Sequence, residues 1–280
     1  MTTVAVIGLG MIGGSVARGL AAKGIRVVGY DRNRSHVDAA LAEGVLTAAV
    51  PSDLSHLADA DSVVIAVYGD SAIEILHRLE SHANDLELVT DVGSTKSAIV
   101  AAADESVLAH CFVGAHPFAG DHRSGWNASR RDLFENELVY LCPSSAAGGA
   151  SIARAKSLWH LLGARTSVAD AVTHDEDLAW TSHLPHVLSS AFAITLSAQR
   201  VAHTQLGRGG RDVARLAGGS PEMWTAVTSE NAESIEKGVI QVQRQLEEFM
   251  RRLRSGSAVE LHDWFTRARE WTVAEEKSAR

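Results

Sequence analysis

Short apolar runs alternate with helix-length segments over about residues 1–168. Strands are predicted where valine and isoleucine dominate: TVAVIGLG, RVVGYD, SVVIAV, ELVTDVG, HCFVGAHP, NELVYLCP and ARTSVAD. Helices are predicted between most of them, as in GGSVARGLAAKG, RSHVDAALAEG, SAIEILHRLESHA and ASIARAKSLWHLLG. Continuous apolar strands separated by helices are typical of a parallel sheet covered on both faces, a doubly wound α/β fold.

The pattern changes at about residue 172, after which the chain has little strand character. DEDLAWTSHLPHVLSSAFAITLSAQRV predicts a long apolar helix, and further helices follow. One of them carries an apolar stripe wide enough to pack on another helix, formed by Ile235, Val239, Val242, Leu246, Phe249 and Leu253. We therefore expect two domains, a dinucleotide-binding domain over 1–168 and an all-helical substrate and dimerisation domain over 169–280.

Charge and composition exclude several classes of partner. The 280 residues carry a net charge of −8, with basic patches no longer than MRRLR, so no nucleic acid is expected as a partner. No stretch of 18 apolar residues occurs, and no signal peptide is expected at MTTVAVIGLG, so no membrane partner is expected. Cys111 and Cys142 lack metal-type spacing, and we expect them to stay reduced in a cytoplasmic protein.

The strongest local motif is VAVIGLGMIGGS, in which Gly8, Gly10 and Gly13 form G-x-G-x-x-G between a predicted strand and helix. The first glycine allows a tight turn, the second admits a pyrophosphate close to the backbone, and the third permits close helix–strand packing. The helix N-terminus would then face the phosphates. We expect this loop, including Met11 and Ile12, to bind a dinucleotide on a Rossmann-type sheet.

An acidic residue ends the second predicted strand. Asp31 follows Gly8 by 23 residues, where a carboxylate binds both ribose hydroxyls of NAD and repels the 2′-phosphate of NADP. Arg32 and Arg34 follow at once and would partly relieve that repulsion. NAD is the expected cofactor, with Arg32 among its contacts, and NADP stays open.

GLGMIGGS is followed along the chain by DVGSTK, HPFAG with SGW and LFEN after it, HDEDLAWTSHLPH and GGRDVARLAGGSPEMW. In this order and spacing, the five stretches resemble the prephenate/arogenate dehydrogenase family of tyrosine biosynthesis. The resemblance implies NAD-dependent oxidative decarboxylation of prephenate to 4-hydroxyphenylpyruvate, or of arogenate to tyrosine. Hydride leaves the ring carbon that bears the hydroxyl, carbon dioxide leaves, and the ring becomes aromatic. The family also implies a homodimer.

Removal of hydride from such a carbon needs a base near the hydroxyl proton, and a neutral imidazole has a suitable pKa. His116 follows an apolar run at the edge of the sheet where ligands of open α/β folds bind. The resemblance makes His116 the catalytic histidine. It also favours Ser94 as a partner of that ring and of the substrate, although Ser94 is equally suited to capping the helix of TKSAIV.

A cyclohexadienyl substrate with two carboxylates needs cationic groups. Arg211 and Arg215 lie four residues apart on one predicted helix face, and arginine suits bidentate carboxylate binding. A solvated turn paired to Asp212 is the alternative. The resemblance gives Arg215 a substrate carboxylate and Arg211 a supporting role, and it places His186 and Trp224 at the pocket.

Two other histidines are interpreted as structural. His183 lies one turn from His186, and two such histidines could form part of a metal site. No acidic or cysteine ligand has a spacing that indicates one, so no metal is expected. His174, in the family's HD pair, is interpreted as part of a helix start or an interdomain contact.

Two residues depart from the family pattern. The family often reads HPMAGTE where this chain reads HPFAGDH, which places Asp121 and His122 beside the expected substrate pocket. These positions border the group that distinguishes the keto acid prephenate from the amino acid arogenate. Asp121 would favour the ammonium of arogenate if it faces the pocket, so the choice of substrate stays open.

Three rival functions share part of this pattern. A 4-amino-4-deoxyprephenate dehydrogenase of specialised metabolism would share all of these motifs. A β-hydroxyacid dehydrogenase would need a catalytic lysine in its helical domain. Lys237 lies there, but deep in a heptad-like helix, which argues against this function. A non-catalytic NAD-sensing protein would need the glycine loop but not His116, Ser94 and Arg215 together.

Overall fold

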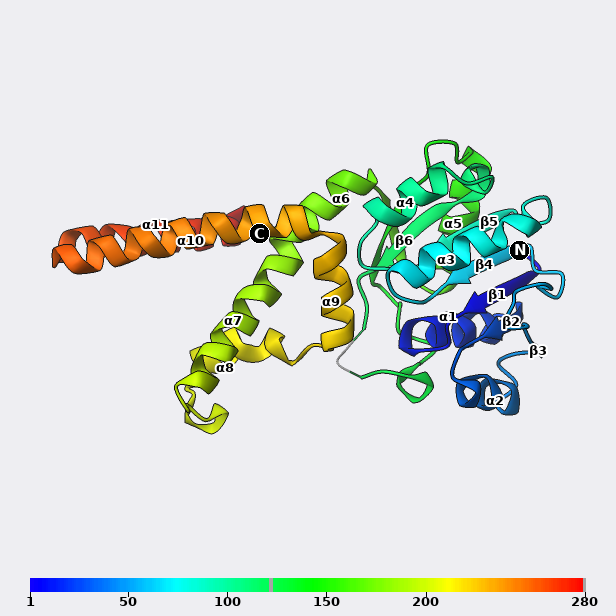
Figure 1. Cartoon of the computed structure of the whole chain (residues 1–280), viewed down its shortest axis with the longest axis horizontal. Helices are drawn as coiled ribbons and strands as arrows, with labels where there is room; N and C mark the ends of the chain where they lie inside the picture. The colour runs from blue at the N-terminus through cyan, green and yellow to red at the C-terminus, as the bar shows by residue number, and fades with distance from the viewer. Residues whose placement is uncertain (121–122, 279–280) are drawn as a thin grey trace. The chain divides into compact units, whose positions relative to one another are not determined.

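The computed structural model describes residues 1–120 and 123–278 (Figure 1). It divides into two compact units, Met1–Asn231 and Ala232–Arg280. The boundary expected between residues 168 and 169 lies inside the first unit and stays a prediction.

Two sheets form the α/β part of the first unit. The larger sheet is parallel with the order β3-β2-β1-β4-β5, and the smaller has the order β6-β7-β8. A bridge between Val89 and Phe112 connects β5 to the start of β6. The strands are β1 Thr3–Ile7, β2 Arg26–Tyr30, β3 Ala48–Ala49, β4 Ser62–Ile65, β5 Leu88–Asp91, β6 Val113–Pro117, β7 Leu138–Pro143 and β8 Arg165–Val168.

Helices cover both faces of the larger sheet, as the alternation of strands and helices predicts. The period of two in the strands divides their side chains between two cores, because Val4 and Val6 face one core while Ala5 and Ile7 face the other. The first core packs against α1, α2 and α5, and the second against α3 and α4. These helices are α1 Met11–Ala22, α2 Arg34–Ala42, α3 Asp70–Arg78, α4 Ser97–Asp104 and α5 Gly149–Leu161.

The smaller sheet differs from the fully parallel arrangement that the apolar runs predict. β7 runs antiparallel to β6 and parallel to β8. The described residues between β6 and β7 form a 3-10 turn at Trp126–Ala128 but no α-helix. A parallel pair needs a long crossover, usually a helix, so its absence between these strands is the signal for an antiparallel pair.

The remaining described part of the first unit is helical. The predicted long helix is divided into α6 Ala171–Leu178, a π-turn Ala179–His183 and α7 Leu184–Ala198. Pro185 lies in the first turn of α7, where its ring would clash with a carbonyl four residues earlier in a continuous helix. The wider π-turn removes that conflict. Two further helices follow, α8 Arg208–Ala214 and α9 Pro221–Glu230.

The second unit contains two helices, α10 Ala232–Ser255 and α11 Ala258–Ser278. Phe249 on α10 lies 5.0 Å from Trp264 on α11 between ring centroids, and Arg252 pairs with Asp263 at 2.8 Å. Leu246, from the predicted apolar stripe, is 56% exposed. Among the described residues, no helix is long and apolar enough to span a membrane.

The glycine loop offers a matched test of close packing. A Cβ at position 13 would lie 2.0 Å from the carbonyl oxygen of Gly8, whereas a Cβ at position 10 would meet no atom within 4 Å. Gly13→Ala should therefore lower the free energy of unfolding by about 2–3 kcal/mol through overpacking. Gly10→Ala should change it by less than about 1 kcal/mol. Urea unfolding of both variants measures the difference, and equal destabilisation would contradict the packing account.

Candidate active site

The glycine loop has the geometry of an anion-binding turn. Gly8 has φ +99°, and a Cβ there would lie 2.3 Å from the carbonyl oxygen of Ala66, so only glycine fits. Gly10 is the N-cap of α1, and no side chain caps the helix there. The first N–H groups of an α-helix have no partner within the helix, so this open turn can receive a phosphate.

Asp31 directly follows β2 and joins it to the glycine loop. Its Oδ2 accepts a hydrogen bond from the backbone N–H of Leu9 at 2.6 Å, and its Oδ1 accepts one from that of Asn33 at 2.7 Å. The Nδ1 of His36 lies 3.2 Å from Oδ2. The carboxylate is therefore fixed beside the loop, while the neighbouring Arg32 is exposed.

The segment that contains His116 approaches the glycine loop. His116 lies within β6 rather than after it, as its next-to-last residue, and it is 9% exposed. Four residues later, a Cβ at Gly120 would lie 3.0 Å from the Cε of Met11 and 3.7 Å from the Cδ1 of Ile12. The end of HPFAG and the glycine loop thus meet at one edge of the fold.

A chain of hydrogen bonds begins at the His116 ring. Its Nδ1 lies 2.9 Å from the Nε2 of His174, and the Nδ1 of His174 lies 2.8 Å from the Oδ1 of Asp175. The Asp175 carboxylate also accepts the backbone N–H groups of Lys96 and Ser97, each at 2.8 Å. His174 lies near the start of α6, as its interpretation as part of a helix start or an interdomain contact expects. The sequence did not show that its partner is the expected base His116.

The start of α4 is capped by Asp175 and not by Ser94. The helix begins at Ser97, and the Asp175 carboxylate from α6 binds its first N–H groups. Among the described residues no hydrogen bond joins Ser94 to His116, so the pairing of Ser94 with that ring stays a prediction. Ser94 lies in the same β5–α4 loop as the buried Lys96, whose Nζ donates to Asp91.

The residues expected at the substrate carboxylates lie in the helical part of the first unit. His186 stacks on Trp224, with ring centroids 3.7 Å apart and planes at 28°. Arg215 begins a 3-10 turn after α8 and is exposed. Burial is the main cause of the lowered pKa of His186, and the charge of Arg215 also contributes to it. Arg211 is also exposed and donates to the backbone oxygen of Leu206 at 2.9 Å.

Contacts connect these helices to the His116 cluster. The side-chain amide of Asn231 donates to the backbone oxygen of Asp175 at 2.7 Å and lies 3.1 Å from the Nδ1 of His183. His183 in turn meets Trp224 edge-on, with ring centroids 6.1 Å apart. Burial lowers the pKa of His183 to about 4, so the ring is neutral. A structural role for His183 stays a prediction.

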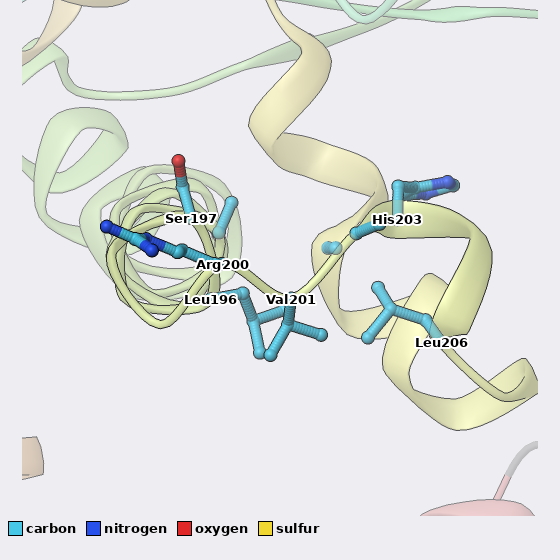
Figure 2. A pocket seen from close by; sticks show the side chains of 9 residues that line it. Leu196, Ser197, Arg200, Val201, His203 and Leu206 are labelled. Carbon is cyan, nitrogen blue, oxygen red and sulfur yellow. The ribbon is translucent and has the colours of Figure 1, made fainter.

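A separate hollow of about 430 Å³ opens between α7 and α8 (Figure 2). Leu196, Val201 and Leu206 contribute apolar side chains to it, with Arg200 and His203 at its sides. None of the site residues predicted from the sequence lines it. It is therefore distinct from the His116 cluster.

Two predicted site residues, Asp121 and His122, lie outside the described residues. Within the described part of the chain, no three His, Cys, Asp or Glu side chains are grouped to hold a metal ion.

Family models match most of the chain. The model described as "Prephenate dehydrogenase, nucleotide-binding domain" matches residues 16–168, a range that begins after the glycine loop. The model described as "Prephenate dehydrogenase, dimerization domain" matches residues 170–267.

Individual relatives agree with the models. A prephenate dehydrogenase of Bacillus subtilis is 29% identical over 96% of this chain and 75% of its own length. The structure of A. aeolicus prephenate dehydrogenase in complex with hydroxyphenyl propionate and NAD+ is 26% identical, with a TM-score of 0.87 over 98% of both chains. Synechocystis arogenate dehydrogenase is 27% identical, with a TM-score of 0.80 over all of both chains. The chain therefore belongs to the prephenate dehydrogenase family of oxidoreductases.

Proposed function

We propose that this NAD-dependent enzyme oxidatively decarboxylates prephenate or arogenate, and that His116 accepts the ring hydroxyl proton. The observation that carries the proposal is the buried His116 ring, whose Nδ1 lies 2.9 Å from the Nε2 of His174. The segment that contains His116 reaches the glycine loop at Gly120. A relative of known structure was solved with hydroxyphenyl propionate and NAD+, which have the chemistry of an aromatic product and the cofactor.

The protonation state of His116 suits a base. Burial first, and then the nearby His174, Lys96 and His183, hold the pKa of His116 well below its ordinary value of 6.5, and Asp175 partly opposes them. The ring is therefore neutral at neutral pH. The imidazole takes the proton as the O–H bond of the substrate hydroxyl breaks. Hydride leaves the substrate carbon that bears this hydroxyl, and carbon dioxide leaves the substrate ring.

The residues of the glycine loop fit a dinucleotide. The open side of Gly10 and the uncapped start of α1 would hold the pyrophosphate, and Met11, Ile12 and Gly13 form that first turn. Asp31 would accept the ribose hydroxyls, and its fixed negative charge disfavours a 2′-phosphate, although the exposed Arg32 stands beside it. NAD supplies the hydride acceptor when bound.

Substrate recognition is proposed for the helical residues. Arg215, with Arg211 and His186, would bind the carboxylates, and Trp224 would pack at the pocket through its stack on His186. No carboxylate of the described residues pairs with Arg215, which leaves its guanidinium available. Ser94 would orient the substrate hydroxyl from the β5–α4 loop.

We also propose that the enzyme is a homodimer. The dimerization-domain model covers residues 170–267, and this range carries large exposed apolar side chains. Ile194 on α7 is 70% exposed and follows Ala193, which lines the hollow of Figure 2. A second copy of the chain would remove such side chains from water.

Initial rates with prephenate, arogenate and 4-amino-4-deoxyprephenate, each with NAD and with NADP, identify the substrate and the cofactor.

His116→Gln should lower kcat on the preferred substrate by about 100-fold or more, because the general base is lost. Its dissociation constant for NAD should stay within about twofold of the wild type, since the ring is not assigned to the cofactor. Unchanged turnover would overturn the base, and no activity on any of the three acids would overturn the function.

The pH profile tests the depressed pKa of His116. A base must be neutral, and here protonation occurs only as the pH falls through a pKa well below 6.5. The acid limb of kcat/KM should therefore lie below pH 6.5, provided that the substrate itself does not titrate there. A limb at or above 6.5 that belongs to the enzyme would contradict burial of a neutral ring.

The dimer is tested by light scattering on two matched variants. Ile194→Lys should shift the protein toward monomer, because it places a charge in the proposed interface. Val107→Lys is the control, because Val107 is 63% exposed and lies outside the dimerization-domain match. A wild-type monomer, or a dimer unaffected by Ile194→Lys, would count against this interface.

A further inference from the structure

We propose that His174 and Asp175 act as a positioning relay that fixes the tautomer of His116, so that Nε2 is the atom left with a lone pair. This inference rests on the proposed function, because it concerns how the base of that reaction is held. It gives His174 a positioning role that acts through His116, in addition to the helix-start or interdomain contact expected from the sequence.

The relay begins at an ionised carboxylate. Asp175 is 3% exposed, yet its two oxygens accept the N–H groups of Lys96 and Ser97 at the start of α4. Burial alone would raise the pKa of Asp175, but hydrogen bonds from His174, Ser97 and Lys96 outweigh it and lower the pKa. An ionised carboxylate only accepts hydrogen bonds, so the His174 Nδ1 at 2.8 Å must donate.

This donation determines the other side of the His174 ring. A neutral imidazole with its proton on Nδ1 has its lone pair on Nε2. The Nε2 of His174 faces the Nδ1 of His116 at 2.9 Å, and two nitrogens at that distance share one proton. The Nδ1 of His116 therefore carries the proton, and its Nε2 accepts.

Aromatic neighbours hold both rings in place. Phe118 lies 4.7 Å from His116, and Tyr140 lies 5.3 Å from His174, between ring centroids. Phe118 and Tyr140 also meet each other edge-on at 5.4 Å. These contacts favour the observed orientation of the two histidine rings, although Phe118 itself is 40% exposed.

The same relay stabilises the ring after proton transfer. As the substrate O–H bond breaks and the Nε2–H bond forms, His116 becomes an imidazolium and its Nδ1–H donates more strongly to His174. His174 is already hydrogen-bonded to the negative Asp175. Other charged or titratable groups near these rings are Lys96, which is paired with Asp91, and His183.

Nitrogen-15 NMR of histidine-labelled full-length protein at neutral pH tests the tautomer without substrate. His116→Gln identifies the His116 signals by their loss. The wild type should show a protonated Nδ1 and an unprotonated Nε2 at His116. An unprotonated Nδ1, as expected if a doubly protonated His174 donates to both neighbours, would overturn the relay.

Substitutions at His174 test its consequence for turnover. His174→Phe removes the acceptor and should lower kcat roughly 100-fold, with KM and NAD affinity nearly unchanged, while the His116 tautomer becomes mixed. His174→Gln keeps an acceptor oxygen and should recover kcat to within about tenfold of the wild type. His82→Gln is the control and should leave kcat unchanged, since the His82 ring bonds the backbone oxygen of Leu54 and belongs to neither the proposed base nor the relay.

The outcomes separate this inference from the proposed function. Turnover of none of the three acids by the wild type defeats the function, whereas the resting tautomer is read without turnover. Normal wild-type turnover with equal kcat in His174→Phe and the wild type defeats the relay alone. If His174→Phe does not fold, the wild-type spectrum and His174→Gln decide.

Discussion

The carboxylate of Asp175 binds the first N–H groups of α4 and the ring of His174 at the same time. Through the α4 contacts it attaches α6 to the loop that follows β5. Through the ring it reaches His116 on β6. Asn231 binds the backbone of the same residue, which extends the connection to His183 and Trp224. Asp175 therefore connects the proposed base, through its side chain, with the proposed substrate residues, through its backbone oxygen.

Burial gives the site its electrostatic character. Lys96 is fully buried but is neutralised by Asp91, whose other oxygen accepts the backbone N–H of Ala115 beside His116. An unpaired buried charge would cost several kcal/mol, so this pair must be complete in the folded protein. The positive end of the pair also helps to keep the His116 ring neutral. Proton abstraction requires a neutral imidazole ring in which one nitrogen has a lone pair to accept the proton.

The sequence was sufficient for the features that depend on local order. Glycine spacing, apolar strands and the acid after β2 each lie within one short segment, and the structure places them together as expected. The antiparallel β7 was missed because strand direction depends on the connection, not on the strand's own pattern. The capping of α4 and the partner of His116 were missed because they join residues far apart in sequence, 78 and 58 positions respectively. The HD pair was visible, but its direction toward β6 was not.

The most direct measurement is a crystal structure of the enzyme with NAD+ and a substrate analogue that retains the ring hydroxyl. The account predicts that the Nε2 of His116 lies about 2.6–3.2 Å from the hydroxyl oxygen. It also predicts that Nδ1 stays on His174. A hydroxyl beyond reach of Nε2, or a His116 ring turned away from His174 in that complex, would contradict it.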